Sequence, residues 1–140
     1  MLSQTTEYAL RAVLHIATQA DGTPVRANAL ASAIGVPQNY LSKTLHQLAR
    51  AGILTSTRGP TGGFQLAVPA QSLTLQRIAS TFEPTPPRRC LLGQGICGQN
   101  PSCRAHAKWA PIATALQTFF GTTTVADLTR TPVPNEVTTP

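Results

Sequence analysis

The sequence predicts a mainly α-helical protein with one small β-hairpin, and three observations support this prediction. Apolar residues recur at helical spacing in several segments before residue 83. Two short strand-like runs flank a glycine-rich turn at 58–63. One more helical stripe follows a long stretch that is rich in proline and glycine. We therefore divide the chain into a head at 1–83, a cysteine-rich loop at 84–103, a long helix with one last turn at 104–128, and a disordered tail at 129–140.

A chain of 140 residues has room for one compact domain with an appended element, and this chain is strongly basic. Eleven Lys and Arg against five Asp and Glu leave a net charge of +6. A basic balance of this size favours polyanionic partners, either nucleic acid or an anionic membrane surface. The sequence shows neither a secretory signal nor a run of about 20 apolar residues, so we expect a cytoplasmic protein with no membrane partner.

The head begins with a predicted helix from Ser3 to about Gln19, with Ser3 as its cap. A short helix over Ala27 to Ile34 follows, and the turn "GVP" at 35–37 connects it to a helix that Gly52 ends. Two helices joined by a short turn with glycine are typical of a helix-turn-helix, whose second helix enters the major groove of DNA.

A hairpin is predicted next, with strands from Ile53 to Thr57 and from Phe64 to Val68 around the turn "RGPTGG". A helix-turn-helix followed by a hairpin is a winged helix, in which Arg58 could enter a narrow minor groove or hold a phosphate. The exposed face of the preceding helix carries amides suited to adenine and cations suited to guanine or phosphate. The predicted DNA-binding residues are Gln38, Asn39, Tyr40, Ser42, Lys43, Arg50, Arg58, Gly59, Thr61 and Gly62.

Two further helical patterns follow the hairpin. A helix at 72–83 is predicted to close the head, and the apolar stripe from Trp109 to Phe120 indicates a dimerisation helix. Pro111 interrupts this stripe, so it either kinks the helix or begins it, with residues 103–109 then forming a separate turn. Thr124 and Asp127 have the spacing of a capping box for one last helical turn.

All three cysteines, Cys90, Cys97 and Cys103, lie between the head and the dimerisation helix. An odd number of clustered thiols is a poor disulfide framework in a reducing compartment and is more typical of a metal or redox site. His106 follows Cys103 by three residues and completes a set of three thiolates and one imidazole. Such a set suits zinc or an iron-sulfur cluster, and the wide spacing slightly favours the larger cluster.

Three stretches carry a resemblance to a known family: "SQTTEYALRAVLHIA", "NYLSKTLHQLARAGILTSTRGPTGGFQLA" and the cysteine pattern that ends in "CRAHAKW". Together they resemble the winged-helix transcription factor family that includes the iron-sulfur cluster regulator IscR and the nitric oxide sensor NsrR, over roughly residues 1 to 128. The resemblance implies a cytoplasmic homodimer on a palindromic operator in double-stranded DNA, acting as a repressor under the control of an iron-sulfur cluster. The implied signals are cluster or iron status, redox stress and nitric oxide.

The resemblance also implies the ligands of the cluster. His106 would be the fourth ligand of a 2Fe-2S site, with a 4Fe-4S cluster or zinc as the alternatives. The NsrR-like branch instead takes an acid from the first helix across the dimer, a position that Glu7 matches. Glu7 is also explained as a surface acid paired with Arg11. The implied cysteine ligands are Cys90, Cys97 and Cys103.

The sequence departs from the family pattern in three places. Six residues separate the first two cysteines, where the family often has fewer, and Pro111 interrupts the helix after the site. Ser42 stands where IscR-like proteins commonly carry an acid, so operator choice is expected to differ.

Two rival functions use the same residues. The first is a winged-helix DNA-binding protein with structural zinc and no sensing role. The second is a thiol enzyme built on Cys103 and His106, but the pattern offers no third orienting group or substrate pocket, so we do not expect an enzyme.

Overall fold

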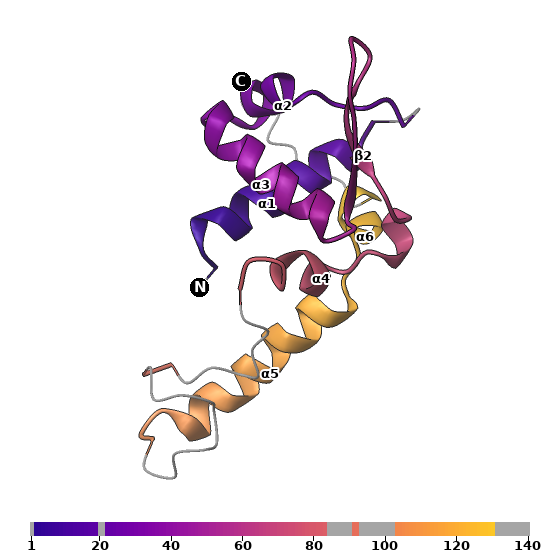
Figure 1. Cartoon of the computed structure of the whole chain (residues 1–140). Coiled ribbons are helices and arrows are strands. Elements are labelled where there is room, and N and C mark those ends of the chain that lie inside the picture. Colours follow the sequence, from indigo (N-terminus) through magenta and orange to yellow (C-terminus); the bar gives the residue numbers. More distant parts are fainter. Residues whose placement is uncertain (1, 20–21, 84–90, 93–102, 131–140) are drawn as a thin grey trace, which may run out of the picture.

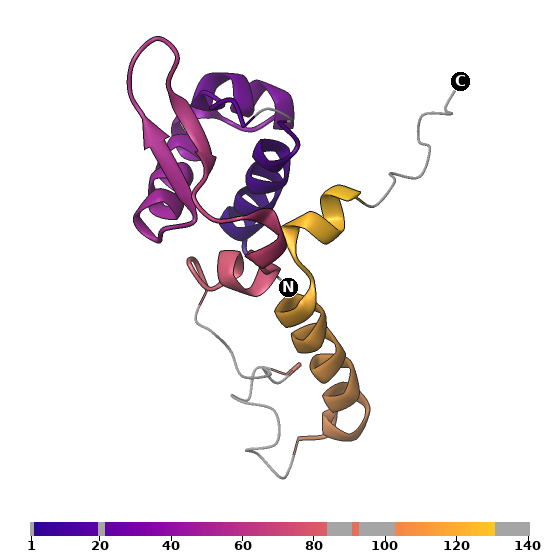
Figure 2. The same ribbon diagram turned by 90° about the vertical axis from the view of Figure 1, so that its right-hand side faces the viewer.

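The computed structural model describes residues 2–19, 22–83, 91–92 and 103–130. A helical head carries a two-stranded antiparallel hairpin at one edge, and one long helix extends away from the head (Figures 1 and 2). This arrangement confirms the mainly α-helical fold with a hairpin wing. The elements are α1 (Gln4–Ala17), α2 (Ala27–Ile34), α3 (Gln38–Arg50), β1 (Leu54–Thr57), β2 (Gly63–Leu66), the 3-10 helix η1 (Ala70–Ser72), α4 (Leu75–Ala79), α5 (His106–Thr122) and α6 (Val125–Arg130).

The first helix, α1, lies in the middle of the head and buries mostly small residues (Figure 1). Ser3 caps this helix as predicted, because its Oγ accepts a hydrogen bond from the Thr6 amide at 3.2 Å. Small side chains let neighbouring elements approach closely, and α2, α3, α4, α6 and β2 all pack against α1. The buried residues of α1 are Thr6, Ala9, Ala12, Val13 and Ile16.

The predicted helix-turn-helix is formed by α2 and α3. Gly35 ends α2 at a φ of 70°, a left-handed conformation that favours glycine, and its amide donates to the Ala31 carbonyl. Pro37 then precedes α3 with a φ of −61°. The apolar face of α3 is fully covered by the head, which leaves the opposite face exposed. The buried residues of α3 are Leu41, Thr44, Leu45 and Leu48.

The predicted hairpin is formed by β1 and β2, in a register that places Thr57 opposite Gly63 at the turn. The second strand was expected to reach Val68, but β2 ends at Leu66. The chain then turns into η1 at Pro69, which has no amide hydrogen to donate to a strand ladder. The hairpin is therefore shorter than its sequence pattern indicates.

Val25 pairs with β2 on the side away from β1. Val25 and Phe64 exchange two backbone hydrogen bonds, from Val25 N to Phe64 O at 2.9 Å and from Phe64 N to Val25 O at 2.8 Å. A Cβ atom at the neighbouring Gly63 would lie 2.6 Å from the Val25 carbonyl oxygen, so this approach requires glycine. The bridge ties the hairpin to the segment that leads into α2.

The predicted helix at 72–83 forms only in part, because α4 spans Leu75–Ala79. The residues just before α4 are extended and pair with the C-terminal segment. The Leu75 amide donates to the Thr123 carbonyl at 3.0 Å, and the Val125 amide donates to the Leu73 carbonyl at 2.8 Å. The predicted start at residue 72 is therefore wrong, since this pairing holds the backbone in an extended conformation.

The long helix, α5, is continuous and contains Pro111. The alternative in which Pro111 begins the helix is therefore wrong. At its C-terminal end the chain returns to the head, where Val125 is fully buried in the same core as α1 and α3. Among the described residues, no helix has both the length and the apolar character needed to span a membrane.

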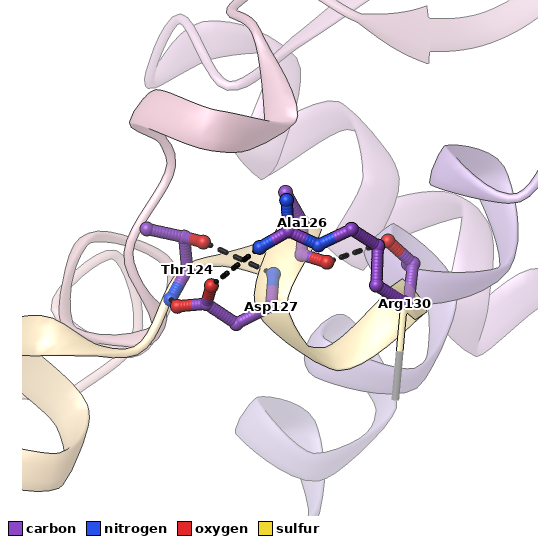
Figure 3. A network of polar contacts seen from close by, with 5 residues as sticks. Thr124, Ala126, Asp127 and Arg130 are labelled. Carbon is purple, nitrogen blue, oxygen red and sulfur yellow. Dashed lines mark hydrogen bonds and ion pairs between the residues drawn. The ribbon is translucent and has the colours of Figure 1, made fainter. Parts of the chain in front are cut away.

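The predicted capping box begins α6 (Figure 3). The Thr124 hydroxyl accepts from the Asp127 amide at 3.1 Å, and Asp127 Oδ2 accepts from the Thr124 amide at 2.9 Å. The predicted tail begins two residues too early, because α6 continues to Arg130, whose guanidinium donates to Asp127 Oδ1 at 3.0 Å. The rest of the predicted tail, 131–140, lies outside the described residues.

Candidate nucleic-acid interface and cysteine segment

The exposed face of α3 carries most of the predicted DNA-binding residues. Gln38 and Asn39 are exposed in its first turn, and Ser42 is half-buried. Farther along α3, an open groove runs over polar and basic side chains. The residues that line this groove are Lys43, His46, Gln47, Ala49 and Arg50. The burial of the leucines on the other face of α3 is what directs these side chains outward.

Tyr40 holds α3 against α1. Its hydroxyl shares a hydrogen bond with the Thr5 hydroxyl, and its ring meets the Tyr8 ring edge-on at a centroid distance of 5.5 Å. The Tyr40 side chain remains 38% exposed. Its predicted contact with DNA stays a prediction, but the structure also gives it a role in setting the orientation of α3.

The wing presents Arg58, Gly59 and Thr61 on its exposed surface, whereas Gly62 is buried inside the turn. The Gly62 amide donates to the Gly59 carbonyl at 3.0 Å, and Gly59 has a φ of 100°. A Cβ atom on Gly62 would lie 2.1 Å from the Thr57 carbonyl oxygen. The burial of Gly62 gives it a role in the shape of the turn, and its predicted contact with DNA stays a prediction.

Arg26 belongs to this surface and was not predicted. Its Nη2 donates to the Gly59 carbonyl at 2.8 Å and also to the Pro60 carbonyl. Arg26 and Arg58 line the same groove, which runs between the wing and the first turns of α2 and α3. No spacing pattern marks a lone arginine before a helix, so only the folded structure connects Arg26 with the wing.

The charge of this region is entirely positive. Residues 22–82 contain no Asp or Glu, although they include α2, α3 and the whole hairpin. A surface with one sign of charge attracts polyanions and repels other cations. The basic residues in this range are Arg26, Lys43, Arg50, Arg58 and Arg77.

The structure describes only part of the predicted metal site. Cys103 is half-buried just before α5, and the amide of His106, the first residue of α5, donates to the Cys103 carbonyl at 3.3 Å. Cys90 and Cys97 lie outside the described residues. Within the described ranges there is no group of three or more His, Cys, Asp or Glu side chains that could hold a metal ion.

Glu7 is exposed on α1, whereas Cys103 lies at the far end of α5 from the head (Figures 1 and 2). The predicted ligation by Glu7 across a dimer stays a prediction. The expected ion pair between Glu7 and Arg11 is not formed among the described residues. Arg11 donates instead to the Ile34 carbonyl and lies 5.9 Å from the centroid of the Tyr8 ring.

Glu83 lies where the head ends and the cysteine-rich loop begins. Its Oε1 accepts from the Ser3 amide at 2.6 Å and from the Thr6 hydroxyl at 3.0 Å. Burial alone would raise the pKa of Glu83, but these hydrogen bonds outweigh it and hold the pKa below the ordinary value. The ionised carboxylate thus fastens this end of the head to the start of α1.

Residues 2–131 match Rrf2, a family described as iron-dependent transcriptional regulators. The chain belongs to the Rrf2 family. A protein of Aquifex aeolicus assigned as an HTH-type transcriptional regulator is 33% identical over 132 residues, which cover 91% of this chain and 90% of that protein. A protein of Haemophilus influenzae with the same assignment is 32% identical over 122 residues, or 86% of this chain and 81% of that protein.

Solved structures of Rrf2 type share the fold. CymR, the global cysteine regulator of B. subtilis, superposes with a TM-score of 0.78 at 22% identity and covers 93% of this chain and 96% of CymR. IscR of T. potens superposes with a TM-score of 0.73 at 20% identity and covers 93% of this chain and 86% of IscR. The membership assigns the chain to DNA-binding transcriptional regulators with a winged helix, and such proteins are not enzymes.

Proposed function

We propose that this Rrf2 regulator is a homodimeric repressor whose affinity for a palindromic operator is controlled by an iron-sulfur cluster. The placement of Cys103 and His106 carries the proposal, because both lie together where the cysteine segment meets α5. Cys90 and Cys97 would supply the other two thiolates from the loop that joins the head to α5. The sensed condition would be cluster or iron status, oxidants or nitric oxide.

The donor set fits such a group. Thiolates are soft ligands that suit iron-sulfur clusters, and an imidazole can replace a thiolate on one iron. When bound, the cluster would supply an oxidation state and a lability that respond to the cell's redox chemistry. A 2Fe-2S cluster is the form we propose for three cysteines and His106, with 4Fe-4S and zinc as alternatives.

Ligation at this place would connect the two ends of the cysteine-rich loop. One end follows Glu83, which is hydrogen-bonded to α1, and the other end is the start of α5. Ligands from both parts would restrict how α5 is placed relative to the head. In a dimer formed through α5, that placement sets the spacing of the two recognition helices on DNA.

The cofactor is tested by anaerobic purification of the full chain. We expect visible absorbance, with iron and acid-labile sulfide in stoichiometric amounts, and loss of all three signals in Cys97→Ser. His106→Ala should weaken or lose the cluster, whereas Glu7→Gln, which leaves every candidate ligand of the proposed set in place, should retain it. A colourless protein with stoichiometric zinc would contradict the proposal and favour a structural metal.

Control of DNA binding is tested on a duplex that the protein itself selects from a random-sequence pool. The cluster-loaded and cluster-free proteins should differ in affinity for this duplex by at least about tenfold at one fixed salt concentration. Equal affinities of the two forms would show that the cluster has no regulatory role.

A further inference from the structure

The backbone of Arg26 is fixed to the hairpin. Val25 immediately before it forms two hydrogen bonds with Phe64 in β2, and Gly63 leaves room for this close approach. Arg26 is also the residue that precedes the first turn of α2, where its carbonyl accepts from the Leu30 amide at 2.9 Å. The backbone from which the Arg26 side chain extends is therefore fixed by both β2 and α2.

The guanidinium of Arg26 reaches the tip of the wing. Nη2 donates to the Gly59 carbonyl at 2.8 Å and to the Pro60 carbonyl, which are consecutive residues of the turn. A guanidinium has only donors and cannot cap the N-terminus of α2, so the contact with the wing does not compete with one to the helix amides. The bridge to Val25 holds the base of the hairpin, and the contact from Arg26 is made farther out, at the glycine-rich turn.

This contact connects the two parts of the DNA-reading surface. Arg58 directly precedes Gly59, so a contact that holds the Gly59 and Pro60 carbonyls also restricts where the Arg58 side chain begins. Arg26, Arg58 and Gln38 line one groove between the wing and α3. The position of Arg58 relative to the first turn of α3 therefore depends on the contact from Arg26.

We propose that Arg26 is a positioning residue that holds the wing, and with it Arg58, in the orientation in which the wing and α3 bind one DNA duplex together. The inference rests on the DNA binding within the proposed function and does not depend on the cluster. It differs from a role as a phosphate ligand, in which Arg26 would act on DNA independently of Arg58.

The first experiment uses the DNA-free full chain. Arg26→Met removes every donor while keeping an unbranched side chain, and Arg26→Lys keeps an ammonium that can donate to both carbonyls. The Gly62 amide, which shares the Gly59 carbonyl with Arg26, should exchange with solvent at least about threefold faster in Arg26→Met and close to the natural rate in Arg26→Lys. Both variants should melt within about 2 °C of the natural protein, because Arg26 is exposed.

The second experiment is a double-mutant cycle on the duplex selected by the natural protein. Arg58→Met should weaken binding about tenfold in the natural background and by less than about twofold in the Arg26→Met background. In the Arg26→Lys background, Arg58→Met should again weaken DNA binding by most of the factor seen in the natural background. Arg130→Met removes one positive charge in α6, away from the wing, and should change affinity by less than about twofold (Figure 2).

The exchange rate of the Gly62 amide and the double-mutant cycle together decide whether Arg26 positions the wing. Faster exchange at Gly62 together with a non-additive cycle supports the positioning role. Unchanged exchange, or losses from Arg26→Met and Arg58→Met that multiply independently, overturns it and assigns Arg26 to direct phosphate binding or to no role. If the natural protein selects no sequence, the proposed function fails, and unchanged exchange at Gly62 would separately show that Arg26 does not hold the wing.

Discussion

The wing can form only with glycine at two adjacent positions, Gly62 and Gly63, and the second of these offers the sharper test. Gly63 has a φ of 146°, and a Cβ there would lie 2.6 Å from the Val25 carbonyl carbon and oxygen. We expect Gly63→Ala to lower the free energy of unfolding by about 1–3 kcal/mol, because both the backbone strain and the clash must be relieved. Thermal or chemical denaturation measures this change. The matched control is Gly121→Ala in α5, where a Cβ meets nothing within 4 Å, and it should be neutral or stabilise by up to about 1 kcal/mol. Equal effects at the two positions would contradict the prediction.

Glu83 makes the stability of the head depend on acid pH. Its pKa in the folded protein lies below the ordinary value of 4.5, so its contribution is fully present above that value and is lost as the pH falls through the folded pKa. Glu83→Gln should lower the free energy of unfolding by about 0.5–1 kcal/mol at neutral pH, after allowance for solvent screening. The difference from the natural protein should shrink below about pH 4.5, as measured by denaturant titrations along a pH series. Thr6→Val removes one of the two donors and should reduce this pH dependence, and a difference that does not vary with pH would contradict the prediction.

At the scale of elements, α5 leaves large apolar side chains uncovered in the single chain. Ile112 is 53% exposed and Phe119 is 46% exposed, although both belong to the stripe that indicates a dimerisation helix. Ile112→Glu or Phe119→Glu should therefore raise the dimer dissociation constant by about 30-fold or more without unfolding the monomer. Sedimentation velocity measures the dissociation, and circular dichroism checks the fold. Gln117→Glu serves as the control, because Gln117 is exposed and lies about 150° around α5 from both Ile112 and Phe119. A dimer that tolerates both glutamates would place the interface elsewhere.

Elements whose partners are close in the sequence could be predicted well. The faces of α1 and α3 and the capping box at Thr124 follow from local spacing, and the structure has all of them. The helix predicted at 72–83 was wrong at its start because the backbone of Leu73 and Leu75 pairs with residues 123–125, a contact that local periodicity does not contain. Periodicity identifies which side of an element is apolar, and distant backbone pairing decides where the element begins.

At the scale of the whole molecule, the candidate interface could be predicted where it lies on a regular element. Most of the predicted polar residues lie on the exposed surface, as their positions in a recognition helix and a wing require: Gln38, Asn39, Lys43, Arg50 and Arg58. Arg26 could not be predicted, because its relation to the wing exists only after β2 has paired with Val25. All four proposed ligands stay predictions. The structure describes two of them, His106 as the first residue of α5 and Cys103 just before it.

The pairing of residues 123–125 with residues 73–75 attaches the C-terminal end of α5 to the head, so any tilt of α5 would pivot at that end. The helix has 17 residues, so at a rise of 1.5 Å per residue its length is about 25 Å. A tilt of only about 10° at the pivot displaces the other end by roughly 4 Å, which is about three quarters of the rise of a full helical turn. His106 and Cys103 lie at that other end, which is the part of α5 that moves farthest when the helix tilts. A change in ligation at this end, as proposed above, would therefore reach the head as a rotation of α5, without requiring a change in the internal structure of either part.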